Sequence, residues 1–371
     1  MGLIITSQAD IDAYFASEAL NQSSLKDLEG GLGSFLAAIA KKKKDKEENK
    51  PTPDYFLVGG AVDCILTGEV GEFEKQYYVS TLEKKPSDAE MMIVNQVFDE
   101  LVREEIEIDL PLTGYLEMLA IAIMDQQWYK GKPGEKRTQG LLERCGPYFE
   151  DMKNSLGMKI LTSEQKNNID NIVNSLKFNP KTKKYFDRDL QDSQENMDFY
   201  YQLPMYFTYE GVECKALMDL VVVYKDLQGE IIRIEPIDLK TMSGSTLSFN
   251  SKIRQHRYDI QAAWYTLALS KHFDFPMEKI DAFKFVVEST TGVGTPLVFQ
   301  ITPETLHHGI YGSPDTTVAS NNERELFYTG KKGYFQLMKE YLYYEGDSFR
   351  QDIIFEKYPD VVLVDYNKGI V

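Results

Sequence analysis

The chain has 371 residues, a formal net charge of -17 and 43% hydrophobic residues. This length and composition predict a soluble globular protein with a large core, built as one large domain or two small ones. No window approaches roughly 18 uncharged apolar residues, and the N-terminus lacks a basic region followed by an apolar stretch, so we expect neither membrane insertion nor secretion. The negative charge argues against a general surface for polyanions but allows a local basic one.

Several common kinds of site are missing from the sequence. Cys64, Cys145 and Cys214 are too few for a four-cysteine metal site and show no disulfide pattern, which favours a reducing cytoplasm. No loop of the type Gly-x-x-x-x-Gly-Lys-Ser/Thr occurs, so we expect no ATP-driven motor. No Gly-x-Ser-x-Gly motif occurs either, which removes the commonest competing class of hydrolase.

The first part of the chain is expected to be helical. Residues 8–40 show a helical pattern, with a cap at Ser23 and Ser24. The run from Lys41 to Asp54 is polar and contains prolines, which predicts a linker or a flexible loop.

An apolar helix is expected after this run. In it, Gly59 and Gly60 would allow close packing of the backbone, and Asp63 would face inward. Residues 87–130 contain further helical patterns, and residues 162–176 begin with a Thr/Ser cap. These helices form a mainly helical half of the chain.

The pattern changes to strands near Tyr200. We expect two strands that turn at Glu210 and Gly211, and then a hairpin formed by residues 216–226 and 230–241, which are rich in Val and Ile.

The hairpin places two carboxylates together. If Gln228 and Gly229 form a two-residue turn, residues whose numbers add to 457 are paired. Asp219 and Asp238 meet this condition, so their Cβ atoms would lie roughly 4.5 to 5.5 Å apart on one face. Lys240 lies two residues beyond Asp238 and points to the same face.

Two carboxylates this close repel each other unless a cation lies between them. Hard oxygen ligands on a rigid sheet suit Mg²⁺, with Mn²⁺ as a substitute. Lys240 adds a point charge for a phosphate or for an attacking water. The alternative is a structural salt-bridge pair at a sheet edge, since Asp-x-Lys and Glu-x-Lys triplets also occur at residues 48–50, 83–85 and 151–153, in expected loops or helices.

A helix is expected over residues 258–272. Gln261 and Tyr265 are one turn apart and therefore lie on one side of it. Three basic residues stand just before this pair, and we expect them to contact a phosphate backbone: Lys252, Arg254 and Arg257. Strands at 282–290 and 296–301 follow, and then a helical tail over residues 322–344 that packs across the sheet.

The order Asp219, Asp238-Leu239-Lys240 and Gln261-Ala262-Ala263-Trp264-Tyr265 resembles the PD-(D/E)xK nuclease superfamily. Within it, the sequence is most similar to the RecB-like branch and to the RecE-type exonucleases of phages and prophages. Residues 21–35, 58–79 and 160–180 are similar to further segments of these enzymes, so the resemblance extends from about residue 14 to about residue 270.

The resemblance implies an α/β fold of the restriction-endonuclease-like kind, with a central mixed sheet flanked by helices and a large helical N-terminal part. We expect a single nuclease domain over residues 1–371. Residues 1–195 would be mainly helical and contribute Asp63, residues 196–305 would hold the catalytic sheet and the Gln261 helix, and residues 306–371 would form a C-terminal helical packing segment.

Asp63 departs from the family pattern, which usually has a histidine after its Gly-x-Ala segment. An aspartate suits Mg²⁺ because this ion prefers oxygen ligands. Asp63 would therefore join Asp219 and Asp238 as a metal ligand, and the resemblance implies that the carbonyl of Leu239 is a ligand too. The alternative is that Asp63 is a solvated or helix-capping residue and that the site lacks this ligand.

The resemblance implies a Mg²⁺-dependent exonuclease that digests linear double-stranded DNA without regard to sequence, from 5′ to 3′, during phage-type recombination. Lys240 would orient or activate water, and Gln261 and Tyr265 would position the strand or the lysine. A homo-oligomer and a single-strand-annealing recombinase partner are implied as well. Two alternatives remain: an inactive DNA-binding protein with a nuclease-like fold, and a structure-specific or nicking endonuclease.

Overall fold

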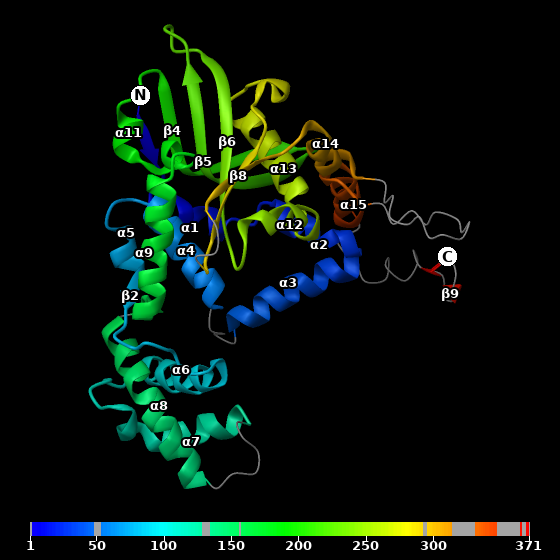
Figure 1. Ribbon diagram of the computed structural model, residues 1–371. Helices are drawn as coiled ribbons and strands as arrows, with labels where there is room; N and C mark the ends of the chain where they lie inside the picture. Colours follow the sequence, from blue (N-terminus) through cyan, green and yellow to red (C-terminus); the bar gives the residue numbers. More distant parts are fainter. Residues whose placement is uncertain are drawn as a thin grey trace, which may run out of the picture.

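A computed structural model describes residues 2–47, 53–127, 134–155, 157–291, 295–313 and 331–346, together with two short C-terminal strands, β9 (Val364–Asp365) and β10 (Gly369–Ile370). The fold is mixed α/β. Within the described residues its centre is a six-stranded sheet in the order β1-β4-β5-β6-β7-β8, with parallel and antiparallel neighbours (Figure 1). The strands of this sheet are β1 (Leu3–Ile5), β4 (Met197–Tyr209), β5 (Val212–Lys225), β6 (Ile231–Met242), β7 (Lys284–Ser289) and β8 (Leu297–Gln300).

Helices from both ends of the chain surround the sheet. The earlier helices are α1 (Gln8–Ala16), α2 (Gln22–Asp27), η1 (Leu28–Gly30), α3 (Leu32–Glu47), α4 (Asp54–Thr67), α5 (Glu72–Gln76), α9 (Ser163–Phe178), α10 (Lys183–Phe186) and α11 (Arg188–Asp192). The later ones are η3 (Thr246–Ser248), α12 (Phe249–Gln255), α13 (Tyr258–His272), η4 (Met277–Lys279), α14 (Pro303–Tyr311) and α15 (Tyr334–Gly346). No helix within the described ranges is long and apolar enough to cross a membrane.

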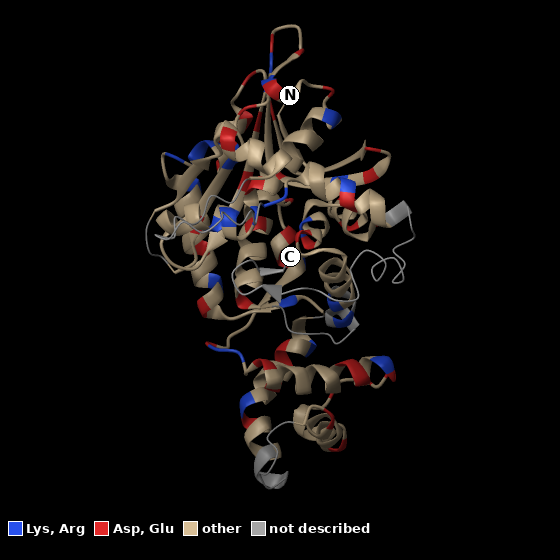
Figure 2. Cartoon of the chain, turned by 90° about the vertical axis from the view of Figure 1, so that its right-hand side faces the viewer, with Lys and Arg blue, Asp and Glu red and all other residues tan. Residues whose placement is uncertain are grey.

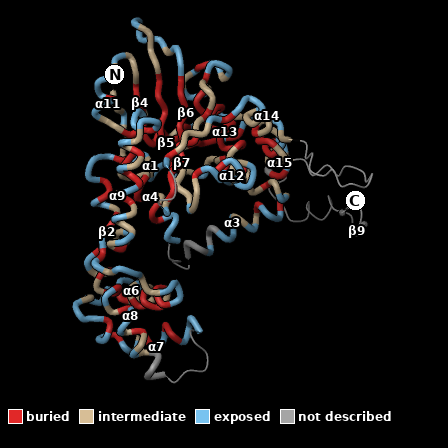
Figure 3. The backbone as a smooth tube through the Cα atoms, viewed as in Figure 1, coloured by how far each residue is buried: buried red, intermediate tan, exposed pale blue. Residues whose placement is uncertain are grey.

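The two faces of the sheet carry different cores. On one face α13 packs with α2 and α15, and the fully buried Trp264 lies at its centre, where its Nε1 donates to the Lys215 carbonyl at 3.1 Å. On the other face α4 and α9 cover the sheet with residues such as Leu66 and Ile169. The most deeply buried parts of the tube in Figure 3 accordingly follow β5, β6 and α13. Because α13 and α4 lie on opposite faces, they approach the same strands from two sides.

A separate helical lobe lies below the sheet (Figure 1). It has its own core, with the fully buried Ile93, Leu119 and Phe149. Its helices are α6 (Asp88–Arg103), η2 (Leu112–Tyr115), α7 (Leu116–Asp125) and α8 (Gly134–Ser155), and the parallel strands β2 (Tyr77–Val79) and β3 (Lys159–Leu161) connect it to the rest. The helical half expected for residues 1–195 therefore divides into a part that covers the sheet and a part that packs on itself.

The helical pattern over residues 8–40 corresponds to α1, α2 and α3, with the short η1 between the last two. The prediction of a cap at Ser23 and Ser24 was wrong, because the side chain of Asn21 accepts from Ser24 N and caps α2. The linker predicted from Lys41 onward was also wrong in its first part, where α3 continues to Glu47. Lysine and glutamate are good helix formers, so a polar run can extend a helix into solvent. Residues 48–52 lie outside the described part.

Other predicted elements are confirmed. Thr162 and Gln165 form a capping box at the start of α9, the turn between β4 and β5 falls at Glu210 and Gly211, and α13 begins and ends where its pattern predicts. The tail helix predicted for residues 322–344 is described only from Tyr334 on, as α15. It packs on α2, α13 and α14, and the Tyr334 ring lies 5.8 Å from that of Tyr209.

The hairpin of β5 and β6 has the predicted register but a different turn. The pairs from Leu220↔Ile237 to Tyr224↔Arg233 have numbers that add to 457, as expected. The turn spans Asp226 to Glu230, with Gly229 at φ 89°, and a bulge after Tyr224 restores the register. The extra loop residue and the bulge offset each other, so the strands pair as a two-residue turn would have paired them.

Glu235 is a buried acid at the far end of these strands. Its carboxylate accepts from Lys284 Nζ at 2.6 Å, Tyr224 Oη at 2.7 Å and Tyr185 Oη at 2.9 Å. Burial alone would raise the pKa of Glu235, but the hydrogen bonds of Lys284 and Tyr224 outweigh it and lower the pKa to about 2. This acid therefore stabilises the fold in its charged form.

We expect Glu235→Gln to lower the free energy of unfolding at pH 7 by about 3 kcal/mol, because it breaks a buried ion pair. The folded-state pKa lies below the ordinary value of 4.5, so the contribution is present above that value and is lost as the pH falls toward 2. Thermal unfolding of both proteins from pH 7 to pH 2.5 should show the gap in Tm closing. The exposed Glu278→Gln should leave Tm unchanged throughout, and a gap that stays constant with pH would contradict this role for Glu235.

Candidate active site

The candidate site lies where β5 and β6 separate. Their pairing ends at Leu220↔Ile237, whereas β6 continues beside β7 as far as Met242↔Ser289. Asp219 and Asp238 are the next residues in the β5–β6 register, one step beyond the last pair. The opposed carboxylates predicted from the hairpin thus lie at a fork in the sheet, where the backbone leaves room between them.

Asp238 is 2% exposed and is held from two sides. Its Oδ1 accepts from Gln261 Nε2 on α13 at 2.8 Å, and its Oδ2 lies 2.5 Å from Lys240 Nζ. Despite this ion pair, Oδ2 has no partner in hydrogen-bonding geometry among the described residues. Burial raises the pKa of Asp238, although Lys240 opposes the shift.

Lys240 is charged in this setting. Burial by itself would lower the pKa of the ammonium, but Asp238 and Asp219 raise it above its ordinary value. The ammonium also lies 5.4 Å from the centre of the Tyr258 ring, within cation–π range.

Asp219 adds a second carboxylate at the fork. Its Oδ2 accepts from the backbone N–H of Leu239 at 2.7 Å, which ties β5 to β6 beyond their last paired residues. Burial, followed by the charges of Asp238 and Asp63, raises the pKa of Asp219 well above its ordinary value. The backbone N–H of Leu239 is therefore bound by the Asp219 carboxylate. The backbone carbonyl of Leu239 stays a predicted metal ligand.

Asp63 supplies the third carboxylate from α4. Its Oδ1 accepts from Thr67 Oγ1 at 3.0 Å and its Oδ2 from Gln202 Nε2 at 2.7 Å. Burial raises the pKa of Asp63 to about 6, with a further contribution from Asp238, while the Thr67 bond opposes it. As the sequence predicted, Gly59 lets α4 approach closely, because a Cβ there would lie 2.9 Å from Thr241 Oγ1 on β6.

The alternation of side chains between the two faces of the sheet shifts by one residue at Asp219. Before it, the even-numbered Ala216 and Met218 of β5 face the core beside α13, and after it the odd-numbered Val221 and Val223 do. The side chains of β4 show the same shift. Gln202 lies on β4 across from this point, between residues paired to β5, and has a φ of 51°. A non-glycine residue rarely adopts this conformation inside a strand. The residue with this unusual backbone conformation is also the one whose side chain donates to the Asp63 carboxylate.

Tyr265 lies one turn beyond Gln261 on α13. It is buried, and burial followed by the charge of Asp238 raises the pKa of its phenol well above the ordinary value. Tyr265, Asp63 and Asp219 line one cavity of about 890 Å³. The structure therefore brings together the predicted carboxylates, Lys240, Gln261 and Tyr265.

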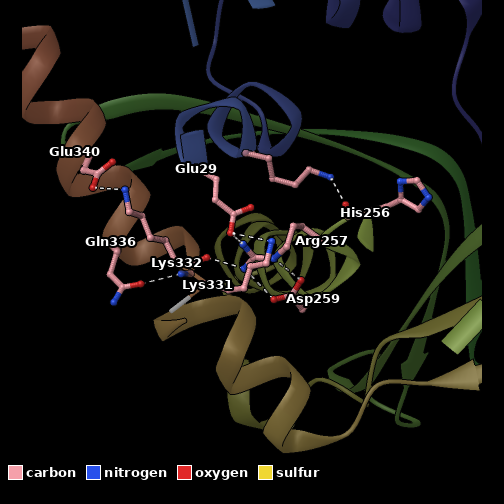
Figure 4. A network of polar contacts seen from close by, with 10 residues as sticks. Glu29, His256, Arg257, Asp259, Lys331, Lys332, Gln336 and Glu340 are labelled. Carbon is pink, nitrogen blue, oxygen red and sulfur yellow. Dashed lines mark hydrogen bonds and ion pairs between the residues drawn. The ribbon is translucent and has the colours of Figure 1, made fainter. Parts of the chain in front are cut away.

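The three predicted basic residues do not share one environment. Lys252 is half-buried and donates to Gln255 Oε1 at 3.1 Å, and Arg254 is exposed. Arg257 is 4% exposed, and its guanidinium binds Asp259, Glu29 and the carbonyl of Lys332 (Figure 4). The expectation that Arg257 contacts a DNA backbone conflicts with this burial, because its donors are already directed at protein oxygens.

Sequence analysis missed three residues at the site. Gln202 and Thr67 hold Asp63, and Lys26 on α2 reaches the region of Lys240, where its Nζ lies 3.2 Å from the His256 carbonyl. Burial, followed by the charge of Lys240, lowers the pKa of Lys26 to about 8. Gln202 and Lys26 depend on contacts between distant segments, so no local motif marks them. Thr67 lies one helical turn after Asp63, and this spacing is visible in the sequence.

A divalent metal needs several oxygen ligands that converge on one point. As the side chains stand, no group of three or more His, Cys, Asp or Glu residues in the described part of the chain is arranged to hold a metal ion. The charge of Asp238 nevertheless raises the pKa of Asp63 and Asp219, and Oδ2 of Asp238 faces only the Lys240 ammonium among the described polar groups, at 2.5 Å. Three carboxylates beside one ammonium leave an excess of negative charge on hard oxygen atoms, which fits Mg²⁺ or Mn²⁺.

Comparison with known proteins leaves the family open. No protein-family model matches the chain, and no curated protein matches it. Among solved structures, one similar chain is a crystal structure named "Putative exonuclease" from Eubacterium rectale, with 17% sequence identity and a TM-score of 0.28. The match covers 57% of this chain and 68% of that one. A TM-score this low does not establish a shared fold.

We expect Asp219→Asn to raise the Tm of the metal-free protein. The substitution removes a half-buried charge that is repelled by Asp238 and Asp63, while its side-chain oxygen still accepts from Leu239 N. Because the folded-state pKa of Asp219 is raised, the ionised carboxylate costs more stability as the pH rises.

The gain in Tm should therefore be largest near pH 8 and should shrink toward pH 4, as measured by thermal unfolding in EDTA. Asp189→Asn, at an exposed aspartate on α11, provides the matched control. A loss of Tm at pH 8 would show that the charge of Asp219 stabilises the fold.

Proposed function

We propose that the protein is a metal-dependent DNA exonuclease that hydrolyses phosphodiester bonds of linear duplex DNA. The observation that carries this proposal is the meeting of Asp63, Asp219 and Asp238 from three separate elements beside the ammonium of Lys240. A structural ion pair at a sheet edge would need one acid and one base. One buried and two half-buried carboxylates beside one another cost stability, and a polyanionic substrate bound with a divalent cation gives them a chemical use.

Asp219, Asp238 and Asp63 would hold the metal, with the carbonyl of Leu239 as a further ligand implied by the family resemblance. A bound Mg²⁺ or Mn²⁺ would supply the activation of water and the neutralisation of charge on the scissile phosphate. Gln202 and Thr67 orient the carboxylate of Asp63 through their hydrogen bonds, which is how supporting residues fix metal ligands elsewhere.

Lys240 and the residues of α13 complete the site. The Lys240 ammonium faces Asp238 and would neutralise a phosphate oxygen and orient the attacking water. Gln261 holds Asp238 through Oδ1, which leaves Oδ2 for Lys240 and for a cation. Tyr265 lines the same cavity as Asp219 and would form one wall of the space that the DNA strand occupies.

The surface that would contact the DNA is limited to a few basic residues near the fork. Acidic and basic residues lie interspersed along the elements of Figure 2, so phosphate contacts would come from a few cations near the fork. Lys252 and Arg254 on α12 are candidates, and Lys26 adds a third from α2. Contacts to phosphates carry no sequence information, which suits an enzyme that must digest any sequence. The family resemblance further suggests 5′ to 3′ digestion, a ring-shaped homo-oligomer and a single-strand-annealing recombinase as partner.

Purified protein with Mg²⁺ should degrade linear duplex DNA and leave closed circles intact. Lys240→Ala should reduce the rate by about 10²- to 10³-fold, because it removes a charge aimed at the transition state. Lys225→Ala is the matched control, since Lys225 also pairs with an aspartate, Asp198, on the same sheet but away from the fork. Gel assays with labelled linear, nicked and closed duplexes measure this.

The other outcomes separate the alternatives. Cleavage of closed circles would indicate an endonuclease, and binding without cleavage in either metal would indicate an inactive DNA-binding protein. Full activity of Lys240→Ala would remove the proposed site.

Asp63→Asn should raise the Mg²⁺ concentration for half-maximal activity by at least about 10-fold, because a charged ligand is lost. Gly59→Ala should shift it in the same direction, since its Cβ would force α4 away from Thr241. The control is Gly146→Ala in α8, where the added Cβ meets no atom within 4 Å. An unchanged Mg²⁺ titration for Asp63→Asn would return this residue to a structural role.

A further inference from the structure

The cavity beside Asp219 continues along β5, away from the carboxylates. Lys215, Leu217 and Asp219 are alternate residues of this strand and all line it. From Lys215 to Asp219 the strand rises by roughly 13 Å, which is long enough for more than one nucleotide. The far end of the cavity is formed by α1 and by the start of α2.

Gln22 at this far end has an unsatisfied amide. It is 8% exposed, and its Nε2 donates to Ser23 Oγ at 2.9 Å, while its Oε1 has no partner among the described residues. The backbone just before Gln22 is held by two hydrogen bonds to β5. The N–H of Leu20 donates to the Glu213 carbonyl at 2.9 Å, and the Leu20 carbonyl accepts from the N–H of Lys215 at 2.8 Å. A buried amide without a partner costs stability, so this group is poised to bind something that enters the cavity.

The charges around Gln22 disfavour a phosphate. The Lys215 ammonium is already taken up by the carbonyls of Tyr14 and Ser17, both at 2.7 Å. Asp12 and Glu72 line the same cavity and would repel an anion, and the second cation on its wall, Lys159, lies over the Tyr77 ring at 5.1 Å. The cavity therefore suits an uncharged group with hydrogen-bonding edges.

Phe15 adds an aromatic surface. It lines the cavity next to Tyr14, and 69% of its side chain is exposed, which is unusual for a ring of this size. The two rings meet edge to face at 5.4 Å, so Tyr14 supports Phe15 from the side. An exposed ring and an unpaired amide that line one cavity are the combination by which proteins stack and hydrogen-bond an unpaired base.

We propose that this end of the cavity is a subsite for a nucleobase near the end of the DNA strand. Phe15 stacks on the base and the Gln22 amide bonds to its polar edge, while the phosphates lie toward Asp63 and Asp219 at the other end of the cavity. This inference rests on the proposed function and adds to it that the enzyme grips an unpaired base as well as the backbone. Strand ends with a base should therefore bind better than abasic ends.

The test uses the whole protein and a linear duplex with 2-aminopurine at either strand terminus, in Ca²⁺ to allow binding without requiring cleavage. We expect the fluorescence to change on binding, and an abasic terminus to bind about 5- to 100-fold more weakly, as loss of one stacked base implies. Phe15→Ala and Gln22→Met should each reduce this preference. Phe178→Ala, at a phenylalanine with 72% exposure on α9, should preserve it.

Gln22→Met also separates binding from structure. If Gln22 served the fold, its loss would lower Tm; as a subsite residue with an unpaired amide, its replacement should leave Tm equal or higher. Equal binding and cleavage of base-bearing and abasic ends by the wild type would overturn the subsite alone. Failure to bind or cleave any duplex would overturn the nuclease and the subsite together.

Discussion

Three carboxylates gathered around one lysine are the constraint on which the rest of the structure depends. Asp238 is buried, Asp63 and Asp219 are half-buried, and the charge of Asp238 raises the pKa of both of the others. Such a group persists only if the surrounding structure supplies compensating contacts. The contacts come from every side of the fork: Gln202 and Thr67 on Asp63, the Leu239 amide on Asp219, and Gln261 with Lys240 on Asp238.

The frame around the fork is closed by a second charged cluster. Arg257 precedes α13 with a φ of 54° and joins Asp259 at the start of that helix to Glu29 in η1 and to the Lys332 carbonyl next to α15 (Figure 4). Segments from the beginning and the end of the described chain therefore meet at the helix that carries Gln261. The position of Gln261 against Asp238 depends on this junction as well as on the core around Trp264.

Local patterns were enough to predict much of the sheet and part of the site. The hairpin register followed from alternating apolar residues and a single glycine, and the Gln261 helix followed from its periodicity. The turn itself was not predictable, because a longer loop and a bulge give the same pairing. The second half of α3 consists of charged residues without an apolar pattern, so only helix propensity distinguishes it from a loop.

Two of the missed residues, Gln202 and Lys26, share one cause. Gln202 owes its role to a backbone conformation set by two strands and a helix, and Lys26 approaches Lys240 only once α2 has packed on α13. Arg257 was assigned to DNA binding because two of its partners, Glu29 and the Lys332 carbonyl, lie far away in the sequence. Contacts between such distant segments leave no spacing to detect in a single sequence.

The left-handed conformation of Gln202 has a consequence for how the protein would respond to selection for robustness. Glycine adopts a φ of 51° without the steric cost that a side chain incurs, so a screen for thermal tolerance would favour it at this position. The same exchange would remove the amide that holds Asp63. At Gln202 the protein therefore keeps a strained backbone conformation, and the side chain in that position orders the Asp63 carboxylate. A substitution that raised thermal stability here would at the same time disorder this carboxylate.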